Sequence, residues 1–366
     1  QGDARAIAAH YRAYLDNRPT GIRRAEAHFR FAEAIASADA DQAIDAWRWI
    51  LVHEPLSSWA TKATAALAGL EATSARARAG WTSNEHITRG MVLFDGMRNP
   101  ESEAAFAAAL ADPSITPADA CTAAYHRAQS RFKARDRKVA APWFDQAIDL
   151  CKAAGNLDLQ IKAAYQAGRS YAFEKQHKVA IERYQAAQQI DPSHSYADDA
   201  LLREAEEWAD LGDDAAVKRT LGALPTRFPQ GDMKAEALWR LGWRAWRKGD
   251  VAGAITQWKA QIAAVPIDDN YWAEGQPQYW LGRAYAKNGD SKAALTWWRD
   301  AVLSYPLSYY AMLALNRIEE TNPDAHRALL AELRRDPPGF DPQAPPFAVA
   351  DQPEWGAPGF ARARSA

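Results

Sequence analysis

The stretch Leu241-Gly-Trp-Arg-Ala-Trp-Arg-Lys-Gly-Asp250 returns forty residues later as Leu281-Gly-Arg-Ala-Tyr-Ala-Lys-Asn-Gly-Asp290. The match extends past these segments, because Ala254, Trp258 and Pro266 recur as Ala294, Trp298 and Pro306. Self-similarity at a fixed period of this length is the sequence signature of repeat proteins. We therefore predict an all-α fold, an α-solenoid in which helical hairpins stack to form a curved superhelix.

Each repeated residue has a physical role in such a hairpin. Gly242 is small and allows the first helix, helix A, to approach the second, helix B. The pair Gly249-Asp250 predicts the turn between them, because glycine adopts left-handed backbone conformations and aspartate caps the helix that follows. Trp258 on helix B is expected to fill the space between hairpins, and Pro266 to end that helix. The pattern resembles the tetratricopeptide repeat.

Weaker copies of the pattern extend upstream when the small residue of helix A sets the register. Gly168 and Ala205 mark two of them, and Ala128, Gly90 and the bulkier Phe31 mark more degenerate ones. The helix B aromatics that follow are predicted to be buried core: Trp47, Phe144, Tyr184, Trp258 and Trp298. An extra helix is expected at 58–70, with a loop around 80–84. We predict a solenoid over residues 1–335, with its strongest repeats at 121–306.

The repeat pattern stops after Pro306, and two further helices are expected at 308–319 and 323–335. Residues 336–358 are rich in proline, which interrupts helices and favours an extended linker. Residues 359–366 are expected to begin a following segment that is cut short, or alternatively to be a frayed natural end. The start at Gln1 rather than Met predicts a mature or trimmed chain.

The sequence contains two cysteines, Cys121 and Cys151. In the register set by Ala128, Cys121 starts helix A and Cys151 ends helix B of one hairpin. These ends lie side by side in an antiparallel hairpin, within the Cα distance that a disulfide requires. A disulfide predicts an oxidising compartment such as the periplasm. The alternative is a pair of small buried thiols.

Composition and motifs exclude several classes of function. The net charge is −2 and no basic stripe is present, so we expect no nucleic-acid partner. No apolar run approaches the roughly 20 residues of a membrane-spanning helix. The sequence lacks the metal-ligand and nucleophile motifs of common enzymes, so we predict no catalytic residue, no metal and no cofactor. His177 and His194 are expected to be solvated, and Glu101-Ser102 to serve the start of a B helix.

Aromatic and arginine side chains on helix A are the stronger candidates for a binding surface. Trp239, Trp243 and Trp246 lie at positions i, i+4 and i+7, hence on one helix face. In this register that face lines the concave groove, where such groups can stack on sugars or hold a peptide. Equivalent positions in other copies hold Tyr165, Arg169, Tyr279 and Arg283. The alternative is that the indoles pack against neighbouring helices.

An ordered series of segments resembles the helical superhelix of soluble lytic murein transglycosylases of Gram-negative bacteria. The series comprises His194–Leu202, Phe228–Asp232, Ala235–Gly242, Gln278–Tyr285 and Tyr305–Leu315. The Ser308-Tyr-Tyr310 element after the last repeat is its most specific part. The proline-rich linker and the pair Cys121/Cys151 are also similar to longer members of that family.

The resemblance implies a periplasmic protein that holds peptidoglycan glycan strands. Those enzymes use a Glu-Ser pair, followed by an aromatic residue and a Gly-x-Met-Gln-Leu-like segment, and this chain lacks that pattern. Glu101-Ser102 has neither context, so no catalytic residue carries over. The resemblance thus implies the non-catalytic scaffold of such an enzyme. The alternative is a periplasmic tetratricopeptide adaptor that binds cell-envelope proteins.

Overall fold

The computed structural model describes residues 4–72, 74–267, 270 and 273–334. Within these residues the regular elements are nineteen helices, and no strand occurs among them. The predicted all-α solenoid of hairpins is confirmed. The chain divides into two compact units, Gln1–Asp268 and Asp269–Ala366, and each is described by itself. The linker predicted at 336–358 and the segment at 359–366 lie outside the described residues.

The first unit begins with a block of five helices. They are α1 (Ala4–Asn17), α2 (Arg24–Ile35), α3 (Ala40–His53), α4 (Ser58–Ala68) and the short α5 (Ala75–Arg78). The helix expected at 58–70 is α4. Trp47 of α3 is buried at the centre of the block, beside Phe29 of α2 and Ala63 of α4. Trp47 therefore serves the core, as its helix B register predicts.

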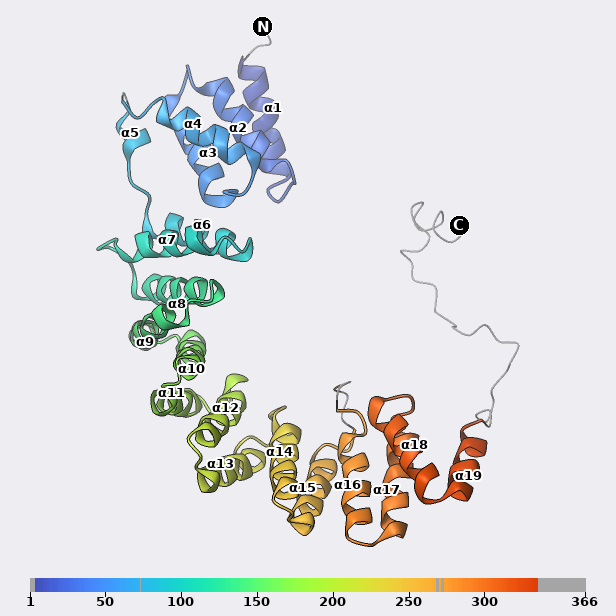
Figure 1. Cartoon of the computed structure of the whole chain (residues 1–366). Coiled ribbons are helices and arrows are strands. Elements are labelled where there is room, and N and C mark those ends of the chain that lie inside the picture. Colours follow the sequence, from blue (N-terminus) through green and yellow to red (C-terminus); the bar gives the residue numbers. More distant parts are fainter. Residues whose placement is uncertain (1–3, 73, 268–269, 271–272, 335–366) are drawn as a thin grey trace. The chain divides into compact units, whose positions relative to one another are not determined.

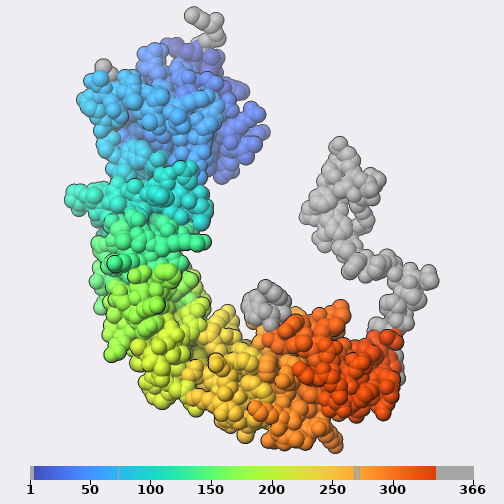
Figure 2. All heavy atoms as spheres, viewed as in Figure 1, coloured from blue at the N-terminus to red at the C-terminus, as the bar shows by residue number. Residues whose placement is uncertain are grey.

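Five helical hairpins complete the first unit. They pair α6 (Ser83–Asp95) with α7 (Asn99–Leu110), α8 (Pro117–Lys133) with α9 (Arg137–Ala153), α10 (Leu157–Phe173) with α11 (His177–Ile190), α12 (Tyr196–Asp210) with α13 (Asp214–Arg227), and α14 (Lys234–Arg247) with α15 (Val251–Ala264). Each helix packs mainly on the helices that precede and follow it in sequence. The hairpins accordingly follow one another in chain order, from blue-green to yellow (Figures 1 and 2). Contacts between neighbours in sequence are what a solenoid requires.

Helices A and B pack closely because a residue without a side chain faces an aromatic ring. A Cβ atom on Gly168 would lie 2.5 Å from Cε1 of Tyr184, and one on Gly90 would lie 2.7 Å from Cε1 of Phe106. Both rings are almost completely buried. The other helix B aromatics that were predicted to be core are also buried: Phe144, Trp258 and Trp298.

The turn between helix A and helix B has the predicted backbone in every well-marked copy. Gly212, Gly249 and Gly289 have φ values of 75°, 79° and 81°. Aspartates follow them, and their side chains accept hydrogen bonds from the first turn of helix B: Asp213, Asp250 and Asp290. Three upstream turns use the same left-handed conformation without glycine, at Met97, Arg135 and Lys175. The geometry of the turn is therefore kept even where the favoured residue is missing.

Prolines follow the ends of five B helices, as predicted. The helices α3, α11, α13, α15 and α17 each end two residues before a proline: Pro55, Pro192, Pro229, Pro266 and Pro306. A proline disfavours helical backbone at the residue before it, so each helix stops at this distance.

The second unit contains α16 (Gln276–Lys287), α17 (Ser291–Ser304), α18 (Tyr309–Thr321) and α19 (Pro323–Leu333). The first two form the last repeat, in which Trp298 of α17 is buried and its Nε1 donates a hydrogen bond to the carbonyl oxygen of Tyr279 at 3.1 Å. The hydroxyl of Ser308 accepts from the backbone N–H of Ala311 at 3.1 Å and so caps α18. The two helices predicted after Pro306 are thus present as α18 and α19.

Cys121 and Cys151 form the predicted disulfide. Their Cα atoms are 4.5 Å apart, and both residues are completely buried. Cys121 lies in the first turns of α8 and Cys151 in the last turn of α9. The bond therefore links the open end of one hairpin, and the alternative of two free thiols is not realised.

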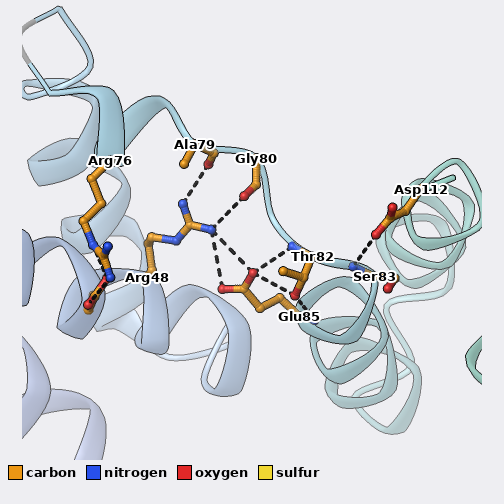
Figure 3. Close-up of polar contacts among 9 residues, drawn as sticks. Arg48, Arg76, Ala79, Gly80, Thr82, Ser83, Glu85 and Asp112 are labelled. Carbon is orange, nitrogen blue, oxygen red and sulfur yellow. Dashed lines mark hydrogen bonds and ion pairs between the residues drawn. The ribbon is translucent and has the colours of Figure 1, made fainter. Parts of the chain in front are cut away.

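Arg48 of α3 connects the first helical block to the first hairpin (Figure 3). Its guanidinium donates to the carbonyl oxygens of Ala79 and Gly80 at 2.7 and 3.1 Å, and lies 3.5 Å from the carboxylate of Glu85. Glu85 forms a capping box with Thr82 at the start of α6. One nearly buried arginine therefore fixes the backbone of the loop that was expected near residue 80 and the start of α6.

Candidate functional site

Three tryptophans of α14 were predicted to line a binding groove. Trp239, Trp243 and Trp246 are each partly exposed. Trp239 stacks on Trp243, with ring centroids 5.7 Å apart, and on the buried Trp258 of α15 at 5.5 Å. Trp246 lies 6.2 Å from the same Trp258 ring. One side of the cluster thus packs on helix B, as the alternative interpretation held, and the rest of it is partly exposed.

Tyr165 and Arg169 of α10 hold the equivalent positions two hairpins earlier. Tyr165 is only 7% exposed and its ring lies 4.9 Å from that of Tyr196, so it belongs to the packing between hairpins. Arg169 is partly exposed, and its guanidinium lies 5.2 Å from the ring of Phe132. The prediction that both residues line a groove is therefore wrong for Tyr165, because the following hairpin covers its ring.

Tyr279 and Arg283 occupy the same positions on α16 in the second unit. Tyr279 is 4% exposed and is packed among the core residues of this unit. Arg283 is partly exposed and donates to the hydroxyl of Tyr279 at 3.1 Å. Its guanidinium lies 5.5 Å from the ring of Trp280. Arg283 thus has accessible surface, whereas Tyr279 differs from the prediction because it is enclosed by its own unit.

A cavity of about 810 Å³ opens between two interhairpin loops of the first unit. Residues 192–196, 198 and 199 line one side, and residues 227–232 line the other. Three carboxylates meet there: Asp198, Asp199 and Asp232. Burial, together with the charges of Asp198 and Asp232, raises the pKa of Asp199 to about 6. No pattern within one repeat indicates this cluster, because Asp198 and Asp199 begin α12 whereas Asp232 comes from the loop before α14.

The acidic cluster carries no metal assignment. Asp198 is 3% exposed, and its carboxylate accepts from the backbone N–H groups of Met233 at 3.2 Å and Asp199 at 3.1 Å. Both of its oxygens are therefore already used within the protein. Carboxylates that are satisfied in this way secure the start of α14 against α12.

The two histidines expected to be solvated are instead paired with carboxylates. Nδ1 of His177 lies 2.7 Å from Glu207, which is nearly buried, and 4.0 Å from the exposed Asp210. Nε2 of His194 lies 3.1 Å from Asp158. Neighbouring hairpins place these acids beside the histidines, and the sequence pattern of one repeat cannot show that. These contacts have the geometry of hydrogen bonds between hairpins.

The Glu101-Ser102 pair has a structural role, as expected. Ser102 is completely buried, and its hydroxyl donates to the carbonyl oxygen of Gly90 at 3.0 Å. It also lies 3.0 Å from the hydroxyl of Ser130 on the next hairpin. Glu101 forms an exposed ion pair with Arg98. Ser102 is thus used in the packing of α7, and Glu101 forms an ion pair at the exposed start of this helix.

Residues 161–194, which include most of α10 and all of α11, match the family model of the tetratricopeptide repeat. The chain carries a tetratricopeptide repeat. The matched segment contains Tyr165, Arg169 and the close contact of Gly168 with Tyr184. A search of curated proteins finds no match.

Several solved structures are similar to this chain at low sequence identity. One is the C-terminal part of a repeat-containing protein from Cytophaga hutchinsonii, with a TM-score of 0.50 and 13% identity, over 78% of this chain and 99% of that one. Another is PilF of Pseudomonas aeruginosa, with a TM-score of 0.41 and 11% identity, over 68% and 97%. A third is the type IV pilus biogenesis factor PilW, with a TM-score of 0.40 and 16% identity, over 64% and 98%. At these identities the likeness concerns the fold alone.

No helix among the described residues combines the length and the apolar character that crossing a membrane requires.

Proposed function

We propose that this chain is a tetratricopeptide scaffold that binds a protein partner in an oxidising compartment outside the cytoplasm, such as the periplasm. The observation that carries the proposal is that three large side chains on A helices of the stacked hairpins are partly exposed. They are Arg169, Trp239 and Trp243. Stacked repeats present extended surfaces of this kind to their partners. Aromatic and arginine side chains are enriched where proteins bind one another.

The buried disulfide supports the compartment. Disulfides form and persist in oxidising environments and are rare where thiols are kept reduced. Cys121 and Cys151 are joined inside the packed array, where they staple the hairpin α8–α9. The pairing thus supports a site of action outside the cytoplasm.

A second candidate is the non-catalytic solenoid of a lytic transglycosylase, which would hold peptidoglycan glycan strands. The observation that favours it is the segment Tyr305–Leu315, whose resemblance to that family is the most specific in the chain. Ser308 caps a separate helix here, directly after the last repeat. Partly exposed indoles such as Trp243 can stack on sugar rings. Catalysis would then belong to a domain that this chain does not contain.

Photo-crosslinking separates the two candidates. The full chain carries benzoylphenylalanine at Trp243 or, as the control, at Lys178, an exposed residue of the B helix α11. Each form is irradiated with detergent-solubilised cell-envelope proteins, and separately tested for sedimentation with purified sacculi. Circular dichroism confirms that both forms are folded. A discrete, protease-sensitive adduct at position 243 but not at 178 supports the scaffold. Sedimentation with sacculi and no protein adduct supports the second candidate and overturns the first.

A further inference from the structure

Two arginines of neighbouring hairpins share one aromatic ring. Arg137 begins α9 and Arg169 lies in α10, and their guanidinium carbons are 3.8 and 5.2 Å from the ring centroid of Phe132. Arg137 also lies 5.5 Å from the ring of Phe173, which is 68% exposed. Two cationic groups therefore share the buried ring of Phe132, and one of them, Arg137, also lies beside the exposed ring of Phe173.

Neither arginine is neutralised by an ion pair within the part of the chain that the structure describes. Arg137 donates to the carbonyl oxygen of Phe132 at 2.7 Å, and Arg169 donates to the side-chain oxygen of Gln166 at 3.3 Å. Both acceptors are neutral. Other arginines of these hairpins and of the next one meet carboxylates at 2.6 to 2.8 Å: Arg131 with Glu103, Arg183 with Asp145, and Arg203 with Glu206. The pair at Phe132 is thus a local excess of positive charge.

The positive charges at this position repel one another. Burial, followed by the charges of Arg169 and Arg135, lowers the pKa of Arg137. Asp199 is near enough to Arg169 for the arginine to oppose the rise of the aspartate pKa, but the two form no ion pair. A bound anion would relieve the repulsion between the arginines. The rings hold the guanidinium groups in place, which reduces the entropy lost when they bind.

We propose that Arg137 and Arg169 bind a carboxylate of an acidic peptide segment in the partner protein, with Phe173 receiving an apolar side chain next to that carboxylate. This inference rests on the proposed scaffold function and names the chemistry of its partner. Charge-assisted hydrogen bonds from two guanidinium groups recognise a carboxylate strongly and with defined geometry. Nucleic acid is not favoured, because its binding requires many neutralised phosphates and this chain has a net charge of −2.

The test measures fluorescence anisotropy of a fluorescein-labelled hexapeptide that alternates Glu and Phe. A peptide with Gln in place of each Glu is the neutral control. The full chain is compared with Arg137→Gln/Arg169→Gln. The matched control is Lys138→Gln/Lys178→Gln, which removes two exposed charges from the same hairpins. Thermal melts followed by circular dichroism establish that both double variants are folded.

The proposal expects the wild-type protein and the lysine variant to bind the acidic peptide at least about tenfold more tightly than the neutral one. The arginine variant should lose this preference. Equal binding of both peptides by the wild type, or an unchanged preference in the arginine variant, overturns the proposal. The proposal is also overturned, in favour of a general anion site, if inorganic triphosphate displaces the labelled peptide as effectively as unlabelled acidic peptide does. If the adduct at position 243 forms despite such a result, the scaffold function stands and only the carboxylate site is refuted.

Discussion

Gly242 lies against the indole of Trp258 with no room for a side chain: a Cβ atom there would be 2.6 Å from Cδ1 of that ring. The same relation holds between Gly282 and Trp298, where the Cβ would be 2.7 Å from Cε2. Both indoles are almost completely buried, so neither can turn away without leaving a void. The glycine and the tryptophan together thus set the distance between helix A and helix B of each hairpin.

Gly242→Ala is therefore expected to destabilise the protein by about 1–3 kcal/mol, the usual cost of overpacking a core. Gly222 in α13 is the matched control, because a Cβ there would meet nothing within 4 Å. Gly222→Ala should stabilise the protein by about 0.4–1 kcal/mol, since alanine has less freedom in the unfolded chain. Urea denaturation followed by circular dichroism measures both. Equal effects of the two substitutions would contradict the packing argument.

Lys175→Gly should raise the stability, and Gly249→Ala should lower it. The two residues occupy the same turn in different hairpins, with φ values of 59° and 79°. A side chain in left-handed conformation costs roughly 1–2 kcal/mol, and the extra freedom of glycine in the unfolded chain offsets part of the gain. We expect the free energy of unfolding to rise by about 0.5 kcal/mol in Lys175→Gly and to fall by about 1 kcal/mol in Gly249→Ala. Melting temperatures measured side by side check the opposite signs, and a shared sign would refute the prediction.

Replacing both cysteines by serine is expected to cost about 3–4 kcal/mol. The disulfide closes a loop with a sequence separation of 30, and the chain-entropy model gives a loss of this size. Wild-type and Cys121→Ser/Cys151→Ser proteins are compared by urea denaturation, and mass spectrometry after alkylation counts free thiols. Because both sulfurs are buried, alkylation of the folded wild type should require unfolding and reductant together. Two thiols that react in the untreated native protein would show that the bond is absent.

Asp199 makes the stability of the protein depend on pH. Burial and two neighbouring carboxylates raise its pKa from 3.8 to about 6 in the folded state. Between these values the folded state binds more protons than the unfolded state, so the contribution of Asp199 to stability falls as the pH rises. As the pH rises from 4 to 6, the unfolding free energy of the wild type should therefore fall relative to that of Asp199→Asn.

Asp191 is the control for this slope. Hydrogen bonds from the side chain and backbone of Ser193 lower the pKa of Asp191. As the pH rises, the unfolding free energy of the wild type should therefore increase relative to that of Asp191→Asn, and this change should occur at lower pH than the change caused by Asp199. Denaturant titrations at several pH values measure both differences. A wild-type minus Asp199→Asn difference that does not change between pH 4 and pH 6 would show that Asp199 has an ordinary pKa.

Arg48→Gln should loosen the loop between the first helical block and the first hairpin. The substitution removes donors from the carbonyl oxygens of Ala79 and Gly80 and leaves Glu85 without its cation, which costs about 1.5–3 kcal/mol for charged hydrogen bonds. Arg76→Gln is the control in the same view, because the Arg76–Asp45 pair is about half exposed and such pairs contribute little (Figure 3). Hydrogen exchange at residues 79–82 should quicken only in Arg48→Gln.

Much of the fold could be predicted from the sequence because its determinants are local. Gly249, Asp250 and Pro266 act on their own backbone, and Trp258 packs on its own hairpin, so one repeat contains the information for its shape. The pairing of Cys121 with Cys151 followed for the same reason, since both belong to one hairpin.

The candidate site was less predictable because it depends on neighbours. Tyr165 has the register of a groove residue, but the next hairpin covers it. The contacts of Arg48 and of Arg169 join residues that are more than thirty positions apart, and a pattern within one repeat does not record them. His177 and its partner Glu207 show the same limit, because the acid comes from the following hairpin.

The disulfide has a consequence for the way in which the array comes apart. Cys121 and Cys151 both belong to α8–α9, so the bond ties this hairpin to itself and to neither neighbour. In an array held by contacts between adjacent repeats, unfolding spreads outward from the weakest interface. Because the disulfide holds α8 and α9 together, these two helices stay close to one another when the neighbouring hairpins unfold. Refolding can then start from this hairpin and proceed toward both ends of the first unit.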